Sequence, residues 1–235
     1  MSFLGEFTGD KELAKSYNYG EHWRNKIGYK ALKGNDNYKH KFGGNDWDIS
    51  VCPNCNTPYH KIMSLDLRDP KLKSIMGICD KELPLISCLN CSSGWGEQFF
   101  KINFEEKKVE LIKNTDTQHW IQDDELRIES PLCEVNMHLT SLNENENPIN
   151  EDLYYELTDS FGEDYFVRVL GAPLYLQGPI NRECPCCHKE MKYIATVGND
   201  CGNMIDSINF DLGEMWLYFM FCNECSILKV ESEGD

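Results

Sequence analysis

Four cysteine pairs of the form Cys-x-x-Cys mark this 235-residue chain. Two residues between the cysteines let both sulfurs of a tight turn point at one metal ion, and zinc takes four such ligands in a tetrahedron. Each ion therefore needs two turns, and the simplest grouping takes both from the same half of the chain. The predicted ligands of two structural Zn(II) ions are Cys52, Cys55, Cys88 and Cys91, and then Cys184, Cys187, Cys222 and Cys225.

The two sets of cysteines repeat each other's spacing. A shift of 132 residues lays the first pair of one set on the first pair of the other, and a shift of 134 does the same for the second pairs. Pro53 and Pro185 each follow the leading cysteine of their set. We interpret this as an internal duplication. Because 32 and 34 residues separate the pairs, more than the ~15–20 of the simplest ribbon, extra strands must lie between the turns.

The duplication predicts a β-rich α+β fold of two zinc-ribbon-like halves packed as one pseudo-symmetric unit. The expected repeats are residues 42–115 and 166–235, preceded by an N-terminal segment, 1–41, and joined by an acidic connecting region, 116–165. Apolar, β-branched and aromatic runs predict the strands. They fall at 62–65, 83–86, 99–102, 108–112, 165–170, 193–197 and 216–221. Weak amphipathic patterns predict helices over 10–23 and 150–161, the second with Asn150 as its N-cap.

Four cysteines lie outside the predicted ligands. Cys186 could replace Cys187, but the repeat favours the two-residue spacing. Its neighbour His188 is expected to face solvent or to support the site rather than bind the ion. The remaining three have no cysteine partner nearby in sequence, and we expect them to be small buried apolar side chains. They are Cys79, Cys133 and Cys201.

No catalytic constellation is visible in the sequence. All-cysteine tetrahedral sites leave no position for water and hold structure rather than hydrolyse bonds. The other histidines lack the spacing of a metal-ligand pair on one helix face. The run Asp123-Asp124-Glu125 fits an exposed acidic turn better than a catalytic pair, and Gly43-Gly44 and Gly94-Trp95-Gly96 fit turns better than a phosphate-binding loop. We therefore expect a protein that is not an enzyme.

The chain is acidic, with 39 acidic and 23 basic side chains and a formal charge of −16. Residues 119–180 alone carry 13 acidic and 2 basic side chains. One interpretation is a solvated face that keeps the protein soluble, and another is a docking surface for a basic protein. Nucleic acid is not the expected partner, since duplex affinity comes mostly from cations that meet phosphates.

Residues 22–41 are the exception to this acidity. Basic residues alternate there with aromatic ones, a pattern that suits stacking on a single strand. The alternative function is therefore a zinc-ribbon nucleic-acid-binding protein that uses this stretch. The residues concerned are Trp23, Arg24, Lys26, Tyr29, Lys30, Lys33, Tyr38, Lys39 and Lys41.

The sequence also predicts where the protein resides. No run approaches ~18 apolar residues, so we expect no membrane span. Residues 1–20 lack the basic region and apolar run of a signal peptide. We expect a cytoplasmic protein, in which 12 cysteines serve as metal ligands or free thiols rather than as a disulfide framework.

A motif near the second set of cysteines carries a family resemblance. The segment Leu170-Gly171-Ala172-Pro173-Leu174-Tyr175-Leu176-Gln177 resembles the signature Gly-Gly-x-Pro-x-Trp-x-Gln, with Ala172 and Tyr175 as departures. With the following Cys184-Pro185-Cys186-Cys187 and Cys222-Asn223-Glu224-Cys225, residues 170–225 resemble the programmed cell death protein 2 superfamily.

The resemblance implies an adaptor or chaperone-like role. Eukaryotic members are associated with escorting a basic ribosomal protein, and bacterial relatives, mostly of unknown function, have been suggested to be immunity proteins beside toxins. Both roles suit an acidic protein that faces a basic client. The expected function is thus a non-enzymatic, zinc-stabilised module that binds a basic protein.

Overall fold

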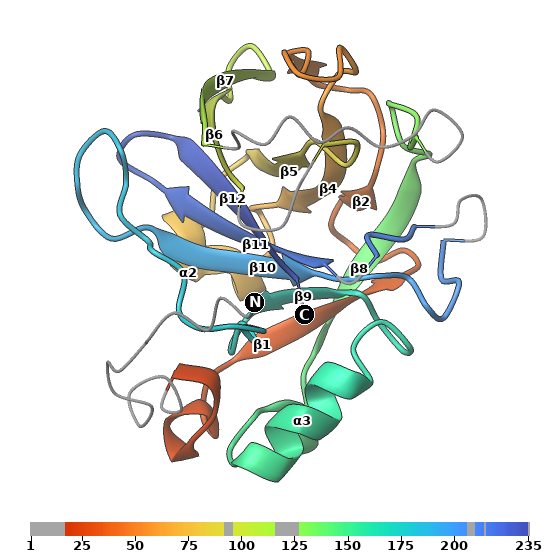
Figure 1. Cartoon of the computed structure of the whole chain (residues 1–235), viewed down its shortest axis with the longest axis vertical. Helices are drawn as coiled ribbons and strands as arrows, with labels where there is room; N and C mark the ends of the chain where they lie inside the picture. The colour runs from red at the N-terminus through yellow and green to blue at the C-terminus, as the bar shows by residue number, and fades with distance from the viewer. Residues whose placement is uncertain (1–16, 92–95, 116–126, 206–209, 214, 235) are drawn as a thin grey trace, which may run out of the picture.

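A computed structural model describes residues 17–91, 96–115, 127–205, 210–213 and 215–234. All strands of these residues form one sheet, in the order β3-β7-β6-β12-β11-β10-β9-β1-β8-β2-β4-β5. Only β3 and β7 pair in parallel, and every other neighbouring pair of described strands is antiparallel. The sheet curls, since β5 at one end of this order contacts β12 (Figure 1). The predicted β-rich fold is confirmed.

The bounds of the elements follow the chain. The strands are β1 (Gly28–Lys33), β2 (His40–Phe42), β3 (Asp48–Ile49), β4 (His60–Asp66), β5 (Glu82–Ser87), β6 (Glu97–Asn103), β7 (Lys108–Asn114), β8 (Val135–Ser141), β9 (Val167–Leu170), β10 (Lys192–Val197), β11 (Met215–Cys222) and β12 (Ile227–Gly234). The helices are α2 (Lys73–Met76) and α3 (Glu151–Asp159), with 3-10 turns η1 (Glu21–Trp23), η2 (Pro70–Leu72) and η4 (Glu144–Glu146).

The strand β11 is buried on both faces of the sheet. Along β11, Leu217, Phe219 and Phe221 enter one hydrophobic core, which lies inside the curl and continues into β4 and β5. The alternate residues Trp216, Tyr218 and Met220 enter a second core, which α3 covers. Successive side chains of a strand point to opposite faces. The prediction that residues 216–221 form a strand buried on both faces is confirmed.

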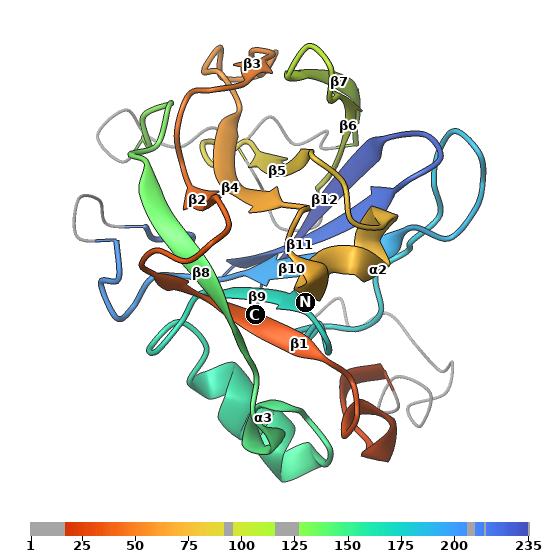
Figure 2. The same ribbon diagram turned by 180° about the vertical axis from the view of Figure 1, so that it is seen from behind.

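Two strands, β1 and β8, lie outside the two predicted repeats. The sequence pattern predicts no strand at residues 28–33 or 135–141, yet β1 and β8 form there and pair with each other in the interior of the sheet (Figure 2). β1 pairs on its other side with β9, whereas β8 pairs with β2. β1 and β8 therefore lie between β9 of the second half and β2, whereas the two halves also pair directly where β6 meets β12.

The two predicted helices fare differently. Residues 150–161 contain α3, and Asn150 caps it as predicted, with its side chain accepting the Leu153 N–H at 2.9 Å. For residues 10–23, the part from 10 to 16 lies outside the described residues. The rest is not one helix, because Gly20 has φ 146° and only the 3-10 turn η1 follows it. No helix among the described residues has both the length and the apolar character to span a membrane.

Candidate metal centres

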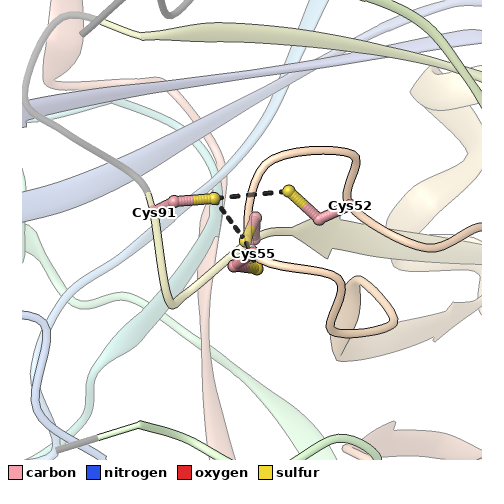
Figure 3. Close-up of side chains that lie close together, drawn as sticks. Cys52, Cys55 and Cys91 are labelled. Atoms are coloured by element: carbon pink, nitrogen blue, oxygen red, sulfur yellow. Dashed lines mark hydrogen bonds between the residues drawn. The ribbon is translucent and has the colours of Figure 1, made fainter. Parts of the chain in front are cut away.

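The structure brings the eight predicted cysteines into two groups of four, with the predicted membership. In the first group the sulfurs of Cys88 and Cys91 lie 3.0 Å apart, and those of Cys52 and Cys91 lie 3.3 Å apart (Figure 3). A disulfide would need about 2.05 Å. Ligands on a zinc tetrahedron with bonds of about 2.3 Å lie about 3.8 Å apart. Each group could thus hold one metal ion.

The leading pair of each group sits in the same turn. The Asn56 N–H donates to the Cys52 carbonyl, and the Cys52 N–H donates to Thr57 O, each at 2.9 Å. In the second group His188 donates to Cys184 O at 3.0 Å and Cys184 donates to Lys189 O at 2.9 Å. Asn56 and His188 both adopt left-handed backbone conformations, with φ of 58° and 59°. The turns match at the 132-residue shift that the sequence analysis found.

The strands that follow these turns match as well. The β4–β5 pairing contains an irregularity between Lys61 and Met63, and the β10–β11 pairing contains one between Tyr193 and Ala195. Both irregularities stand at the same 132-residue offset. A bulge of this kind re-aims the strand and raises its twist, so the two pairs of turns are presented by strands of the same local shape.

The first group is fully enclosed. Cys52 and Cys88 are 0% exposed. The chain at Ile128 packs against the core that contains these cysteines, and we call it the cover. It is fastened to the turn between Cys88 and Cys91, because the Asn90 amide both accepts the Ile128 N–H at 2.8 Å and donates to Ile128 O at 2.9 Å, and His60 Nε2 donates to the same carbonyl at 3.0 Å. His60 Nδ1 accepts the Leu89 N–H at 3.2 Å, which leaves the proton on Nε2. The cover thus rests on fully buried polar side chains.

The thiols of the first group shift one another's pKa values in opposite directions. Contacts with the thiols of Cys88 and Cys91 hold the pKa of the Cys52 thiol far below the ordinary range. The same contacts raise the pKa of Cys88 and raise that of Cys91 to about 12. A divalent cation relieves this competition, because it binds all four sulfurs as thiolates. The donor set therefore fits a soft or borderline metal, of which zinc is the commonest for four cysteines.

The second group lies at the surface. Cys184 and Cys222 are buried, whereas Cys187 and Cys225 are half-buried. The Lys189 backbone N–H holds the pKa of the Cys187 thiol at about 7. Across the two turns Lys189 forms an ion pair with Glu224 at 2.7 Å. In the described part of the chain no segment covers this group as Ile128 covers the first.

The residues beside the second group take the predicted places. Cys186 is exposed, and Cys187 rather than Cys186 joins the group. His188 Nδ1 lies 2.6 Å from Glu183 Oε1, on the surface and away from the sulfurs. The three remaining cysteines correct the sequence analysis, which expected them to be buried. Cys79 and Cys133 are half-buried and Cys201 is exposed, because Cys201 lies in a turn after the last residues of β10.

A third group that resembles a metal site has another explanation. Asp36, His40 and Asp69 lie close enough together to ligate an ion. However, His40 Nδ1 accepts the Asp66 N–H at 3.1 Å, so its proton is on Nε2, which faces Asp69 Oδ2 at 3.2 Å. Neither ring nitrogen then has a lone pair for a metal. Burial lowers the pKa of His40 although Asp69 opposes this effect, and the pair is structural.

The basic and aromatic stretch 22–41 does not form one face. Arg24 pairs with Glu21 at 2.7 Å, Lys30 with Glu146 at 2.6 Å and Lys41 with Glu134 at 2.9 Å. Tyr29 is buried in the core. The stretch is thus divided between η1, β1 and β2, and three of its six cations form ion pairs within the chain. The runs at Asp123 and at Gly94-Trp95 lie outside the described residues.

Comparisons with protein-family profiles, with curated proteins and with solved structures find no match to this chain.

Proposed function

We propose that this chain is a non-enzymatic, zinc-stabilised module that binds a basic protein through the outer face of α3, in an adaptor, chaperone or toxin-immunity role. One observation carries the proposal: six carboxylates on α3 and the turn after it are exposed, and none forms an ion pair with a described residue. They are Glu151, Asp152, Glu156, Asp159, Glu163 and Asp164.

The arrangement on the helix favours a protein partner over plain solvation. Asp152, Tyr155, Glu156 and Asp159 follow the i, i+3, i+4, i+7 spacing of a single helix face. Tyr155 is 55% exposed in the middle of this face. Tyrosine is enriched among the residues that dominate binding energy at interfaces. Elsewhere exposed carboxylates are commonly neutralised, as Glu224 is by Lys189 at 2.7 Å.

We also propose that two zinc ions hold the scaffold and that the scaffold arose by duplication. Two Zn(II) ions would each close one group of four cysteines, and the matched turns and bulges support an origin by duplication of one zinc-ribbon-like unit. Closed four-cysteine sites provide rigidity rather than reactivity. A rigid base under α3 lowers the entropy cost of docking a partner there.

The test compares the acidic face with a matched surface. Asp152→Lys, Glu156→Lys and Asp159→Lys reverse three charges on α3. The control reverses three charges around the β6–β7 turn, which lies at the opposite end of the molecule (Figure 1): Glu105→Lys, Glu106→Lys and Glu110→Lys. The immobilised full chain is exposed to cell extract at low salt and eluted by a salt gradient, and captured proteins are identified by mass spectrometry.

We expect the wild type and the control to capture the same strongly basic protein and the α3 variant to lose it. Tyr155→Ala should weaken capture without flattening its salt dependence, because it removes no charge. Equal capture by the α3 variant and the control would contradict the proposal. Retention of nucleic acid rather than protein by the wild type would favour the alternative based on residues 22–41.

A further inference from the structure

A cavity of about 750 Å³ opens where three distant parts of the chain meet. Its walls come from the η1 segment before β1, from α2 of the first half, and from the loop that follows β9 in the second half, on the side of the molecule where η1 and α2 lie (Figure 2). Small-molecule sites commonly measure about 300–1,000 Å³. The cavity is separate from both cysteine groups, since no cysteine lines it.

Aromatic side chains line this cavity, and two of them are fixed from behind. Tyr193 and Tyr175 are 9% and 4% exposed. The Tyr193 hydroxyl lies 2.8 Å from Thr196 Oγ1, and the carbonyl of Tyr175 accepts the Tyr154 hydroxyl at 2.5 Å. Trp23 from η1 joins them, and its indole N–H has no hydrogen-bond partner among the described residues. Trp23 and Tyr17, which is 39% exposed, offer stacking surface, whereas Tyr175 and Tyr193 close the cavity with little exposed ring, and the buried Trp23 indole N–H is an unpaired donor.

The loop after β9 reaches this position because two glycines touch. A Cβ on Gly171 would lie 2.9 Å from the Gly28 Cα, closer than real side chains allow. Gly171 also has φ 71°, which favours glycine. The contact lets the start of β1 lie directly against the loop, so that Ile27, 70% exposed, stands at the cavity's edge. The resemblance motif thus contributes its glycine to the shape of the cavity.

The charge of this cavity is opposite to that of the chain. Lys26, Arg182 and His22 line it, and no aspartate or glutamate does. Lys26 has no ion pair with a described residue, whereas Arg182 pairs with Glu190 beyond the lining. In a protein of net charge −16, a cavity with two cationic side chains, Lys26 and Arg182, and no acidic one beside aromatic rings favours an anion with a planar group.

We propose that this cavity binds a mononucleotide, with the base against Trp23, Tyr175 and Tyr193 and the phosphate near Lys26 and Arg182. Base stacking on aromatic side chains does not depend on the base's identity. Arginine and lysine both serve as phosphate ligands. The site does not involve the α3 face, so it stands or falls independently of the proposed protein client.

The test is a titration of the zinc-loaded, ¹⁵N-labelled full chain with adenosine monophosphate. Trp23→Phe identifies the Trp23 indole N–H cross-peak, and calorimetry gives the dissociation constant. We expect the ligand to shift this cross-peak. Lys26→Ala combined with Arg182→Ala should weaken binding about tenfold or more, because two charged contacts are lost. Lys113→Ala on β7, the matched control, should change binding less than about twofold.

Three results would overturn the proposal. The cross-peak could fail to move at millimolar ligand, or adenosine could bind as tightly as its monophosphate, or inorganic phosphate alone could bind as tightly. Because Lys26 is exposed, Lys26→Glu provides a single change that leaves the core intact and should also abolish binding. The α3 triple variant should keep the affinity of the wild type, which separates this site from the proposed function.

Discussion

The two cysteine groups share their turns but differ in what surrounds them. The positions equivalent to Lys189 and Glu224 are Thr57 and Asn90, and both pairs bridge their two turns. In the second group the bridge is an exposed ion pair at 2.7 Å, whereas in the first group, between buried Asn90 and half-buried Thr57, it is a neutral contact at 3.5 Å. A buried charge pair would have to repay a large desolvation cost. The same backbone motif therefore carries side chains that suit its depth.

From this difference in burial we expect the two groups to contribute unequally to the free energy of unfolding. The first belongs to the main core, next to Tyr59, and its removal would leave a cavity and unpaired buried groups. The second lies at the margin of the smaller core under α3. We expect the first to be required for the fold and the second to fasten two hairpin turns.

The largest expected effect comes from breaking the first group. Structural zinc contributes roughly 10 kcal/mol to the folding of small zinc domains, comparable to the entire stability of a typical protein. Cys88→Ser should therefore leave the chain unfolded at 25 °C, whereas Cys225→Ser should keep a cooperative unfolding transition at a lower Tm. Circular dichroism and elemental zinc analysis provide the measurements.

Cys201→Ser, at an exposed position, is the control for the loss of a thiol and should match the wild type. The comparison would be wrong if Cys225→Ser unfolded the protein as completely as Cys88→Ser.

Metal removal gives the next largest contrast. A chromogenic chelator should extract one equivalent of zinc quickly from the half-buried second group and the other slowly, about tenfold or more apart, because the first group must wait for the cover at Ile128 to open. Alkylation during the fast phase, mapped by mass spectrometry, should label Cys187 and Cys225 before Cys52 and Cys88. Release of both ions in one phase would argue against the difference in burial.

The cover itself can be weakened by a single change. Asn90→Ala leaves the half-buried Ile128 N–H without its acceptor and should cost about 2 kcal/mol. Glu224→Ala at the equivalent surface position should cost less than about 1 kcal/mol. Urea unfolding measures both, and Asn90→Ala should also speed the slow zinc phase. Equal costs for the two variants would show that depth does not separate the groups.

The smallest expected effect depends on pH. His40 stands three residues before Gly43, and Arg168 stands three before Gly171, and both are 0% exposed. Burial lowers the pKa of His40 below its ordinary value of 6.5, against Asp69, Asp36 and Asp66, which favour the charged ring. Its contribution is present above pH 6.5 and is lost as the pH falls below that value, because the unfolded chain then binds the proton.

Between pH 7 and 6 this loss is at most about 0.7 kcal/mol. His40→Gln, which keeps a neutral side chain with a donor and an acceptor, should remove this share of the pH dependence in urea unfolding. If the unfolding free energy of His40→Gln depended on pH as that of the wild type does, His40 would not be the source of this pH dependence.

The sequence predicted what depends on local patterns. The spacing of Cys-x-x-Cys pairs identified both groups, and Asn150 identified the start of α3. The strands β1 and β8 were missed although β8 alternates regularly, with Met137 and Leu139 buried between more exposed neighbours. In β8 the neutral polar residues Asn136, His138 and Thr140 interrupt the apolar runs on which the other strands were predicted.

Long-range features had no local signal at all. Nothing in the sequence near residue 128 marks it as the cover of a cysteine group, because its partners Asn90 and His60 lie 38 and 68 residues away. The same holds for the buried cation Lys229, whose partner Glu97 comes from another strand. Such pairings depend on strand order, which sequence periodicity does not encode.

The pairing of β1 with β8 and β9 limits the order in which the sheet can form during synthesis. β1 lies between β8 and β9, so the strand at residues 28–33 leaves the ribosome long before either neighbour exists. At ordinary synthesis rates β9 follows on the order of ten seconds later. During that time the first half has its cysteines and can take up metal, but its leading strand has no sheet to join. Until β8 and β9 have been synthesised, β1 is therefore an unpaired strand of the nascent chain.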